Sequence, residues 1–410
     1  MEDGQGACAN LAKAAAALTV LSLLPVAFVG SAPSHASAGL LPIYSSSTPG
    51  STNGETPYSS FLFGSFAYDE PQGQVLGSYV KFSYIAPMGP IRSYLATGAL
   101  SPVLYIGSID VGPFLPLRDP KVSGPTFFVQ GYDVEIRAHD DPTGLLEIRT
   151  MSSREVTIEL PASATNISQH ATEVTGPGSW PASSVSYTVG EDHARLVLGA
   201  GSFTVTGTQV VAHMGQSDLL VFKAVPAASP YKAEWRAVLD AIAAGQVVAE
   251  FDLVATSGGA WVENSARYRI DLAGWPQQVA PGKASVHVNS TAPVGAVLLL
   301  AFDPATMPAD ATREIRVRAN GADVNVTADA LGLFYSPESR ASETSYTVLP
   351  LPGTVIAVYL PSLASTSVEV ESAVTPAPPI AFEADSILAL SLAVIIVAGA
   401  ASLMFRRRET

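Results

Sequence analysis

Five side chains close together in the sequence have types and a spacing that suit the binding of a cation. Asp133 and Glu135 lie two residues apart in an alternating stretch, so they share the polar face of an expected strand. His139, Asp140 and Asp141 follow in a turn. Carboxylate oxygens that converge in this way bind a hard cation such as Ca²⁺. Alternatively, acids that alternate along a strand form a solvated face and the turn is only a turn, and the residue types favour this second interpretation.

No motif of a known catalytic centre is present. The chain lacks the nucleophile elbow, the HExxH helix, the phosphate-binding loop, the EF-hand loop and the dinucleotide-binding fingerprint. A glycosidase needs two carboxylates at a set separation, and a chain with 36 acidic residues offers many pairs and no means of choosing between them. The sequence therefore indicates no cofactor and leaves enzymatic activity undecided.

A group of aromatic residues in the first third of the chain is the other candidate for ligand binding. Such rings could form a platform on which sugars stack, or they could fill a hydrophobic core. Because Phe82 and Tyr84 lie two residues apart on one face of an expected strand, the core is the favoured interpretation. The group consists of Tyr79, Phe82, Tyr84, Tyr94 and Tyr105.

The elements that must position these residues are predicted to be strands. Short runs in which every second residue is apolar recur along the chain, separated by Gly and Pro, as in 78–84, 132–137, 155–160 and 202–206. Many such strands with turns between them are typical of antiparallel sandwiches or barrels. We expect a mainly β fold with two or three antiparallel sandwich-like domains.

One amphipathic helix interrupts the strands. Ser229 is the expected cap and Pro230 the expected first-turn proline, and Gly245 can close the helix. An apolar stripe runs from Trp235 to Ile242 at helical spacing. A single helix of this size is expected to pack over the end of a sheet rather than bind a ligand.

A hairpin is predicted around Asn320-Gly321, which is typical of a type I′ turn. This turn pairs residues on either side of it, and one face of the hairpin is then apolar and the other polar. The expected apolar pairs are Ala319 with Ala322, Val317 with Val324 and Ile315 with Val326, and the polar pairs are Arg318 with Asp323 and Arg316 with Asn325.

Three asparagines lie in sequons for N-glycosylation, namely Asn166, Asn289 and Asn325. The hairpin register places Asn325 on the solvent side, where a glycan could be carried. In an exported domain, three sequons together favour a glycoprotein.

The two ends of the chain predict export and membrane anchoring. An apolar run followed by Ala36-Ser37-Ala38 is typical of a cleaved signal peptide, with an uncleaved anchor as the alternative. Near the other end, twenty uncharged residues precede three arginines, which predicts one membrane span with a cytoplasmic C-terminus and the rest of the chain outside the cell. The expected regions are 1–38 signal peptide, 39–60 Ser/Thr/Pro-rich linker, 61–226 β-rich extracellular region, 227–278 helix and strands joining the domains, 279–373 C-terminal β-sandwich, 374–385 Pro-rich spacer, 386–405 transmembrane helix and 406–410 basic tail.

Composition restricts the partners. The chain has 48% hydrophobic residues, which suffices for large cores, and a net charge of −14, which repels the phosphate backbone of nucleic acids. Its only cysteine, Cys8, precedes the predicted cleavage point, so the mature protein is expected to have no disulfide and no cysteine-bound zinc.

In overall architecture the chain resembles membrane-anchored surface glycoproteins of prokaryotes, including archaea. The resemblance rests on the leader, the acidic cysteine-free β-regions, the Pro-rich spacer and the terminal span. It implies a structural or adhesive role in the cell envelope, with a surface glycan or another protein as partner. A membrane-tethered hydrolase of polysaccharide or peptide, and an accessory or sensory subunit of an envelope complex, are the alternatives.

Overall fold

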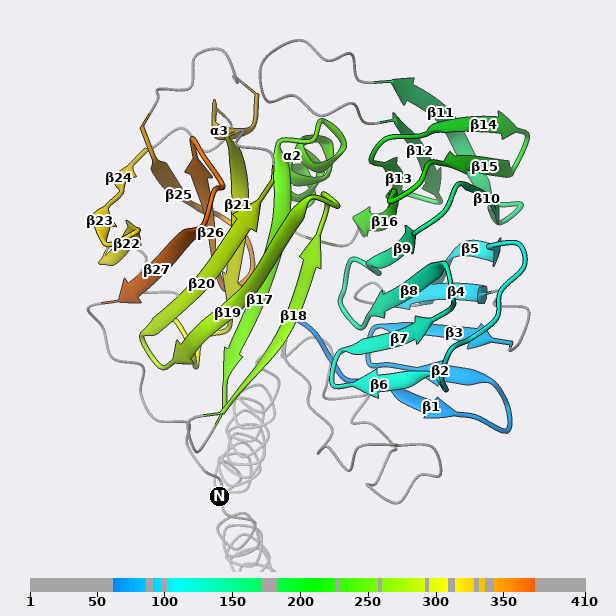
Figure 1. Ribbon diagram of the computed structural model, residues 1–410, viewed down its shortest axis with the longest axis horizontal. Coiled ribbons are helices and arrows are strands. Elements are labelled where there is room, and N and C mark those ends of the chain that lie inside the picture. The colour runs from blue at the N-terminus through cyan, green and yellow to red at the C-terminus, as the bar shows by residue number, and fades with distance from the viewer. Residues whose placement is uncertain are drawn as a thin grey trace, which may run out of the picture. The chain divides into compact units, whose positions relative to one another are not determined.

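Figure 1 shows the computed structural model, which is built mainly from β-strands. It describes residues 62–85, 91–97, 102–171, 183–225, 229, 231–256, 260–291, 295–308, 314–327, 332–335 and 343–372. The expectation of a mainly β chain with several antiparallel sheets is confirmed.

Sixteen strands come from the described residues of 62–225, here called the first β unit: β1 (Ala67–Asp69), β2 (Gln74–Leu76), β3 (Val80–Tyr84), β4 (Ile91–Thr97), β5 (Pro102–Asp110), β6 (Lys121–Ser123), β7 (Thr126–Gln130), β8 (Val134–His139), β9 (Leu146–Thr150), β10 (Arg154–Glu159), β11 (Ala164–Ala171), β12 (Ser183–Val189), β13 (Asp192–Leu198), β14 (Ser202–Thr206), β15 (Gln209–Met214) and β16 (Leu219–Val225). The helix α2 (Lys232–Ala243) follows. The described residues of 247–372, here called the second β unit, contain β17 (Val247–Ala255), β18 (Trp261–Arg267), β19 (Leu272–Ala280), β20 (Lys283–Ser290), β21 (Ala296–Phe302), β22 (Ile315–Ala319), β23 (Ala322–Asp323), β24 (Asn325–Val326), the one-turn helix α3 (Gly332–Tyr335), β25 (Ser345–Leu349), β26 (Thr354–Leu360) and β27 (Thr366–Ser372).

The first β unit consists of two eight-stranded sheets. Their strand orders are β1-β2-β3-β4-β5-β10-β15-β14 and β11-β12-β13-β16-β9-β8-β7-β6. Each sheet crosses from the earlier strands to the later ones at one antiparallel pair, β5 with β10 in the first and β9 with β16 in the second. These pairs join the two halves edge to edge and cover strand edges that would otherwise be free to bind another chain.

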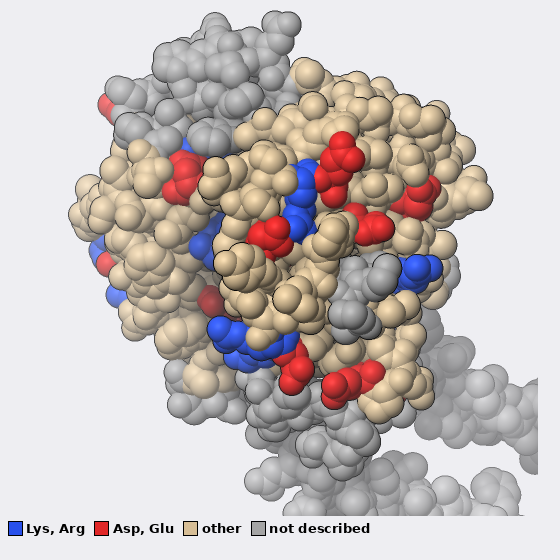
Figure 2. Space-filling model, turned by 45° about the vertical axis from the view of Figure 1, so that its right-hand side comes forward, with Lys and Arg blue, Asp and Glu red and all other residues tan. Residues whose placement is uncertain are grey.

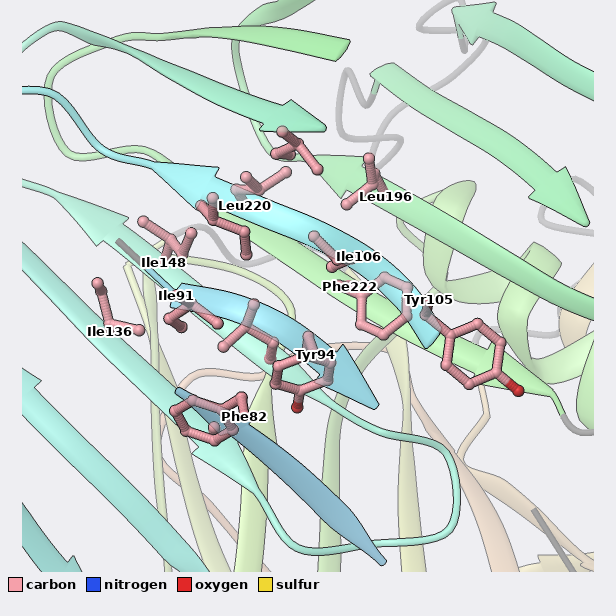
Figure 3. Packing of buried hydrophobic residues seen from close by; sticks show 14 of the residues in the cluster. Phe82, Ile91, Tyr94, Tyr105, Ile106, Ile136, Ile148, Leu196, Leu220 and Phe222 are labelled. Carbon is pink, nitrogen blue, oxygen red and sulfur yellow. The ribbon is translucent and has the colours of Figure 1, made fainter. Parts of the chain in front are cut away.

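The core of the first β unit lies between its two sheets and is rich in aromatic rings. Phe82 stacks on Tyr94 at 5.4 Å and meets Phe127 of the other sheet edge to face at 5.2 Å. Figure 3 shows Tyr94 and Tyr105 beside Phe222 in this core, with Phe82 next to Tyr94. All five aromatic residues of the predicted group are buried, which confirms the core interpretation. Each such side chain contributes about 1.5–3 kcal/mol through burial.

The second β unit has a six-stranded sheet, β18-β17-β21-β26-β25-β24, and a five-stranded one, β19-β20-β27-β22-β23. Its core is mainly aliphatic. The expectation of antiparallel pairing alone is wrong here, because β17 pairs parallel with β21. A parallel pair needs a long crossover, and the intervening β18 to β20 provide it. The strands β17 to β19, expected to connect two domains, belong to these sheets.

The predicted helix is present as α2, but its start differs. The N-cap is Tyr231 and makes no side-chain capping bond, so the expected cap at Ser229 is wrong. The Ser229 hydroxyl instead accepts a hydrogen bond from the Tyr231 N–H at 3.3 Å. Gly245 follows the helix with φ of +69°, as expected of a closing glycine. The buried stripe around Val238 and Ile242 packs with strands of both β units.

The hairpin prediction is correct at the turn and as far as Val324, whose N–H donates to the Val317 carbonyl at 2.9 Å, and it is wrong beyond that residue. Asn320 and Gly321 have φ of +50° and +79°, as a type I′ turn requires, and Ala319 and Arg318 pair with Ala322 and Asp323 as expected. After Val324 the chain leaves this sheet, and β24 pairs parallel with β25 of the other sheet. The expected pairs of Ile315 with Val326 and of Arg316 with Asn325 therefore do not form, and Val326 is exposed.

The predicted signal peptide, linker, spacer, transmembrane helix and basic tail lie outside the described residues. Within the described part of the chain, no helix combines the length and the apolar character needed to cross a bilayer.

Candidate functional site

Two of the predicted cation ligands, Asp133 and Glu135, are paired with basic side chains. Asp133 lies 2.5 Å from an Arg154 nitrogen and accepts a hydrogen bond from Ser152 at 2.9 Å. Burial alone would raise the pKa of Asp133, but these two partners lower it below its ordinary value. Glu135 is held by Arg137 at 2.6 Å. Both carboxylates are thus occupied and half-buried, not freely solvated.

Asp140 has a different role from the one predicted. Its fully buried carboxylate accepts hydrogen bonds from the backbone N–H groups of Ser78, Tyr79 and Val80 at 2.7–2.9 Å. A Cβ atom at Gly64 or Gly77 would lie within 2.3 Å of these oxygens, so both positions require glycine. N–H groups present positive charge to the carboxylate, which favours an anion and disfavours a cation in this cradle.

The structure does not assemble the four acidic candidates, Asp133, Glu135, Asp140 and Asp141, into one cluster. Among the described residues, no three His, Cys, Asp or Glu side chains form a group that could hold a metal ion. Asp141 accepts hydrogen bonds from the N–H and the hydroxyl of Thr143, which fixes the turn after β8.

Asp141 and its neighbour His139 also contribute to a buried polar network where the first and second β units meet. All described residues lie within one compact unit. We call this group the junction network, and each of its side chains is less than 10% exposed. Its members are His139, Asp141 and Lys223 of the first β unit and Glu250, Asp252, Asn264 and Tyr268 of the second.

An ion pair lies at the centre of the junction network. The Lys223 ammonium is bound to Glu250, and the Tyr268 hydroxyl donates to the same carboxylate at 2.5 Å. Lys223 also donates to the Tyr268 oxygen at 3.2 Å and lies 5.5 Å from the centre of the Trp235 ring of α2. Burial alone would lower the pKa of Lys223, but the carboxylates of Glu250 and its neighbours raise it, so the lysine is charged.

An amide connects the remaining members. Asn264 Oδ1 lies 2.7 Å from His139 Nδ1, and Asn264 Nδ2 lies 3.4 Å from carboxylate oxygens of both Asp141 and Asp252. Because the amide nitrogen of Asn264 faces carboxylates, its oxygen faces His139 and accepts a hydrogen bond from the tautomer that carries a hydrogen on Nδ1. Burial, and then the charge of Glu250, raise the pKa of Asp252 well above its ordinary value, which favours its neutral form beside the Lys223–Glu250 pair.

Further contacts extend the junction. The buried carboxylate of Glu147 on β9 accepts the backbone N–H of Arg267 on β18 at 2.9 Å, and Arg195 on β13 pairs with Asp240 of α2 at 2.6 Å. Most polar side-chain atoms of the junction network have a hydrogen-bond partner, and the buried His139 Nε2 is an exception among the described residues. The arrangement suits a structural joint.

Sequence reasoning missed the central ion pair of the junction. Glu250 and Asp252 alternate with the apolar Phe251 and Leu253, a pattern that indicates a solvated face. The available signal was Lys223, a single lysine within the otherwise apolar strand β16. A lysine that must be buried needs an acidic partner.

A cavity of about 400 Å³ lies in the first β unit. The turn between β1 and β2 and the segment 116–120 form its walls. Its lining combines buried tyrosines, which form the floor, with exposed charged residues at the rim and several prolines. The lining residues are Tyr68, Glu70, Pro71, Gln72, Gly73, Tyr84, Ile85, Pro116, Arg118, Asp119 and Pro120.

The two tyrosines of this cavity are protonated at neutral pH. Burial raises the pKa of Tyr84 to about 12, and the neighbouring Tyr68 adds to the shift. Burial also raises the pKa of Tyr68, and the charges of Glu70 and Asp119 raise it further. The Tyr84 hydroxyl is hidden from solvent and makes no hydrogen bond with the described residues. It is a donor without a partner.

Exposed apolar side chains continue from the cavity along the surface. Pro116 of the cavity wall pairs with Gly131 in an isolated bridge, and the N–H of Tyr132 donates to Leu115 at 3.2 Å. Tyr132 is 77% and Leu115 is 70% exposed, and Leu117 is also exposed. Large apolar side chains that gather on a surface are typical of an interaction site.

The charged side chains on the face seen in Figure 2 are of mixed sign. Acidic and basic groups lie beside one another there, with uncharged side chains over much of the rest. The described residues of this face thus carry no continuous basic surface of the kind that phosphate backbones bind.

Comparison with known proteins leaves the family open. No protein family and no curated protein matches the chain. A crystal structure of the active YidC insertase with its first transmembrane domain resolved is similar over 43% of this chain and 45% of that chain, with 8% sequence identity and a TM-score of 0.27. The match thus spans less than half of the insertase chain.

Proposed function

We propose that this chain is a single-pass, membrane-anchored extracellular protein with a structural or adhesive role in a prokaryotic cell envelope. In this proposal the described β units are sandwich-like extracellular domains, residues 386–405 form the transmembrane helix, and the arginines after it remain in the cytoplasm. The leader and the Pro-rich spacer of the sequence support this topology.

The observation that carries the proposal is the junction network. A buried ion pair and the apolar face of α2 connect the two β units, so the two should hold a constant relative orientation. A component that builds a lattice or presents a binding surface to another cell needs such a constant orientation. A hydrolase needs instead a cleft with converging catalytic groups. Among the described residues, no three His, Cys, Asp or Glu side chains form a group that could hold a metal ion for such a reaction.

The exposure of the three sequon asparagines supports this proposal. Asn166, Asn289 and Asn325 are all exposed. Asn166 has φ of +53° and donates to Thr188 at 3.2 Å, and Asn289 accepts the N–H of Ser365 at 3.3 Å. Their side chains are accessible on the surface, and in this proposal they carry glycans of the mature protein.

Protease shaving of intact cells that express the chain tests the proposal. We expect release of a glycosylated fragment that begins near Gly39 and ends before Ser386, identified by mass spectrometry. A variant with Leu392→Arg and Ile396→Arg is the control, because each arginine at the centre of a span costs about 2.5–3.5 kcal/mol. This variant should appear in the medium without protease.

Two results would overturn the proposal. If the chain resists protease in intact cells but is digested after lysis, it is not exposed on the surface. If the released fragment cleaves polysaccharide or peptide, the tethered hydrolase replaces the structural or adhesive role.

A further inference from the structure

The cavity of the first β unit has a lining of mixed chemistry. The phenol of Tyr68 supplies a donor from its floor, whereas Glu70 and Asp119 supply acceptors from its rim. Pro71, Pro116, Pro120 and Ile85 add apolar surface between these polar groups. A volume of about 400 Å³ lies within the usual range for small-molecule sites.

This chemistry makes several classes of ligand less favourable than others. An anionic ligand such as a phosphate would meet the negative charges of Glu70 and Asp119. Arg118 at the same rim offsets one of these two negative charges, which weakens the attraction for a cationic ligand. A purely apolar ligand would remove the solvent from these charged groups without replacing its hydrogen bonds, which is costly. A neutral molecule with several hydroxyl groups and apolar CH faces satisfies both parts of the lining.

We propose that this cavity, together with the adjacent Tyr132, binds a neutral carbohydrate. Sugar hydroxyls would donate to Glu70 and Asp119 and accept from the phenol of Tyr68, which also lines the cavity. This gives the adhesive role proposed above a ligand class and rests on that role. Its test measures binding by the purified chain, so it succeeds or fails independently of where the chain is located.

Tyr132 extends the site beyond the cavity. It is 77% exposed, and it follows Gly131, which pairs with Pro116 of the cavity wall. An exposed aromatic ring beside a polar cavity provides a flat apolar surface on which a second sugar ring can stack. The site therefore suits an oligosaccharide better than a single sugar.

The experiment measures the binding of defined oligosaccharides to the full-length chain, purified in a polyoxyethylene detergent whose headgroup contains no sugar. The probes are neutral hexamers of β-1,4-linked glucose, β-1,4-linked N-acetylglucosamine and α-1,6-linked mannose, with hexagalacturonate and hexalysine as charged comparators. Isothermal titration calorimetry measures the affinity, and saturation-transfer NMR identifies the sugar protons in contact. We expect at least one neutral hexamer to bind with a Kd on the order of 1 mM or tighter.

Variants locate the binding. Tyr132→Ala should weaken it about tenfold, whereas Tyr132→Phe should retain it because the ring remains. Glu70→Gln combined with Asp119→Asn should weaken it by at least as much. All these side chains are exposed, so the variants should unfold at the wild-type temperature. Trp261→Ala removes an exposed aromatic ring from the second β unit and should leave the affinity unchanged.

Three results would overturn the proposal. The first is that no neutral hexamer binds at concentrations up to about 10 mM. The second is that one binds but Tyr132→Ala and the Glu70/Asp119 variant do not weaken it. The third is that hexalysine or hexagalacturonate binds more tightly and displaces the neutral probes, which would assign the cavity to a charged ligand.

Discussion

The junction network and the cavity of the first β unit are both built from tyrosines and acidic side chains, but they differ in how these groups are paired. In the network, Lys223, Glu250 and Tyr268 bind one another and are buried. At the cavity, the Tyr84 hydroxyl has no partner among the described residues and the acidic side chains are exposed. A closed and paired network stabilises a fold, whereas exposed acidic side chains beside an open cavity are available to a ligand.

The largest expected effect comes from removing the cation of the junction network. Lys223→Met leaves Glu250 buried without its counter-charge, and it should lower the free energy of unfolding by about 3–5 kcal/mol. Urea denaturation at pH 7, followed by circular dichroism, measures the change. The control is Lys283→Met, which removes a lysine that is paired with Glu371 at 2.7 Å on an exposed sheet surface. This variant should unfold almost as the wild type does, and equal losses in both variants would contradict the assignment.

Asp140 predicts a pH dependence of stability. Burial raises the pKa of Asp140 from 3.8 to about 6, although three backbone N–H groups oppose the shift. The folded state therefore keeps the proton to a higher pH than the unfolded chain, and this contribution to stability is present below pH 4 and is lost as the pH rises to about 6. The loss amounts to about 3 kcal/mol.

The measurement is urea denaturation of the wild type and of Asp140→Asn across this pH range. The variant loses part of the N–H cradle and should be less stable than the wild type at every pH, but the difference should be largest at low pH. A difference that is constant between pH 4 and pH 6 would show that Asp140 does not titrate in this window.

Within the junction network, two acids on the same strand should respond differently. The raised pKa of Asp252 favours its neutral form, which an asparagine imitates, so Asp252→Asn should change the free energy of unfolding by less than about 1 kcal/mol. Glu250→Gln removes the partner of Lys223 and should cost about 3–5 kcal/mol. The same denaturation experiment at pH 7 compares the two variants. Equal losses would mean that Asp252 carries a charge in the folded protein.

Local patterns predicted those parts of the fold that depend on neighbouring residues. The Asn320-Gly321 turn, the apolar stripe of α2 and the alternation along β3 each follow from a few adjacent side chains. The path after Val324 and the parallel pairing of β17 with β21 depend on strands far away in the sequence, so no local pattern indicates them.

The same distinction explains the candidate sites. Alternation shows that the two faces of β17 differ, but it does not show whether water or another sheet covers the polar face that carries Glu250 and Asp252. The cavity is formed by segments around Tyr84 and Pro116, which meet only in the folded chain. The burial of Tyr84 was predictable from β3, whereas its place in a cavity wall was not.

The smallest expected effect compares two buried tyrosines. Tyr105 donates its hydroxyl to Asp192 at 2.6 Å, so Tyr105→Phe should lower the free energy of unfolding by about 1–2 kcal/mol. Tyr84→Phe removes a hydroxyl that has no partner, so stability should be unchanged or higher by up to about 1 kcal/mol. Thermal and urea denaturation measure both variants. If Tyr84→Phe is destabilised as much as Tyr105→Phe, the folded chain holds the Tyr84 hydroxyl after all, whereas a gain in stability would show that the buried, unpaired hydroxyl costs the fold free energy.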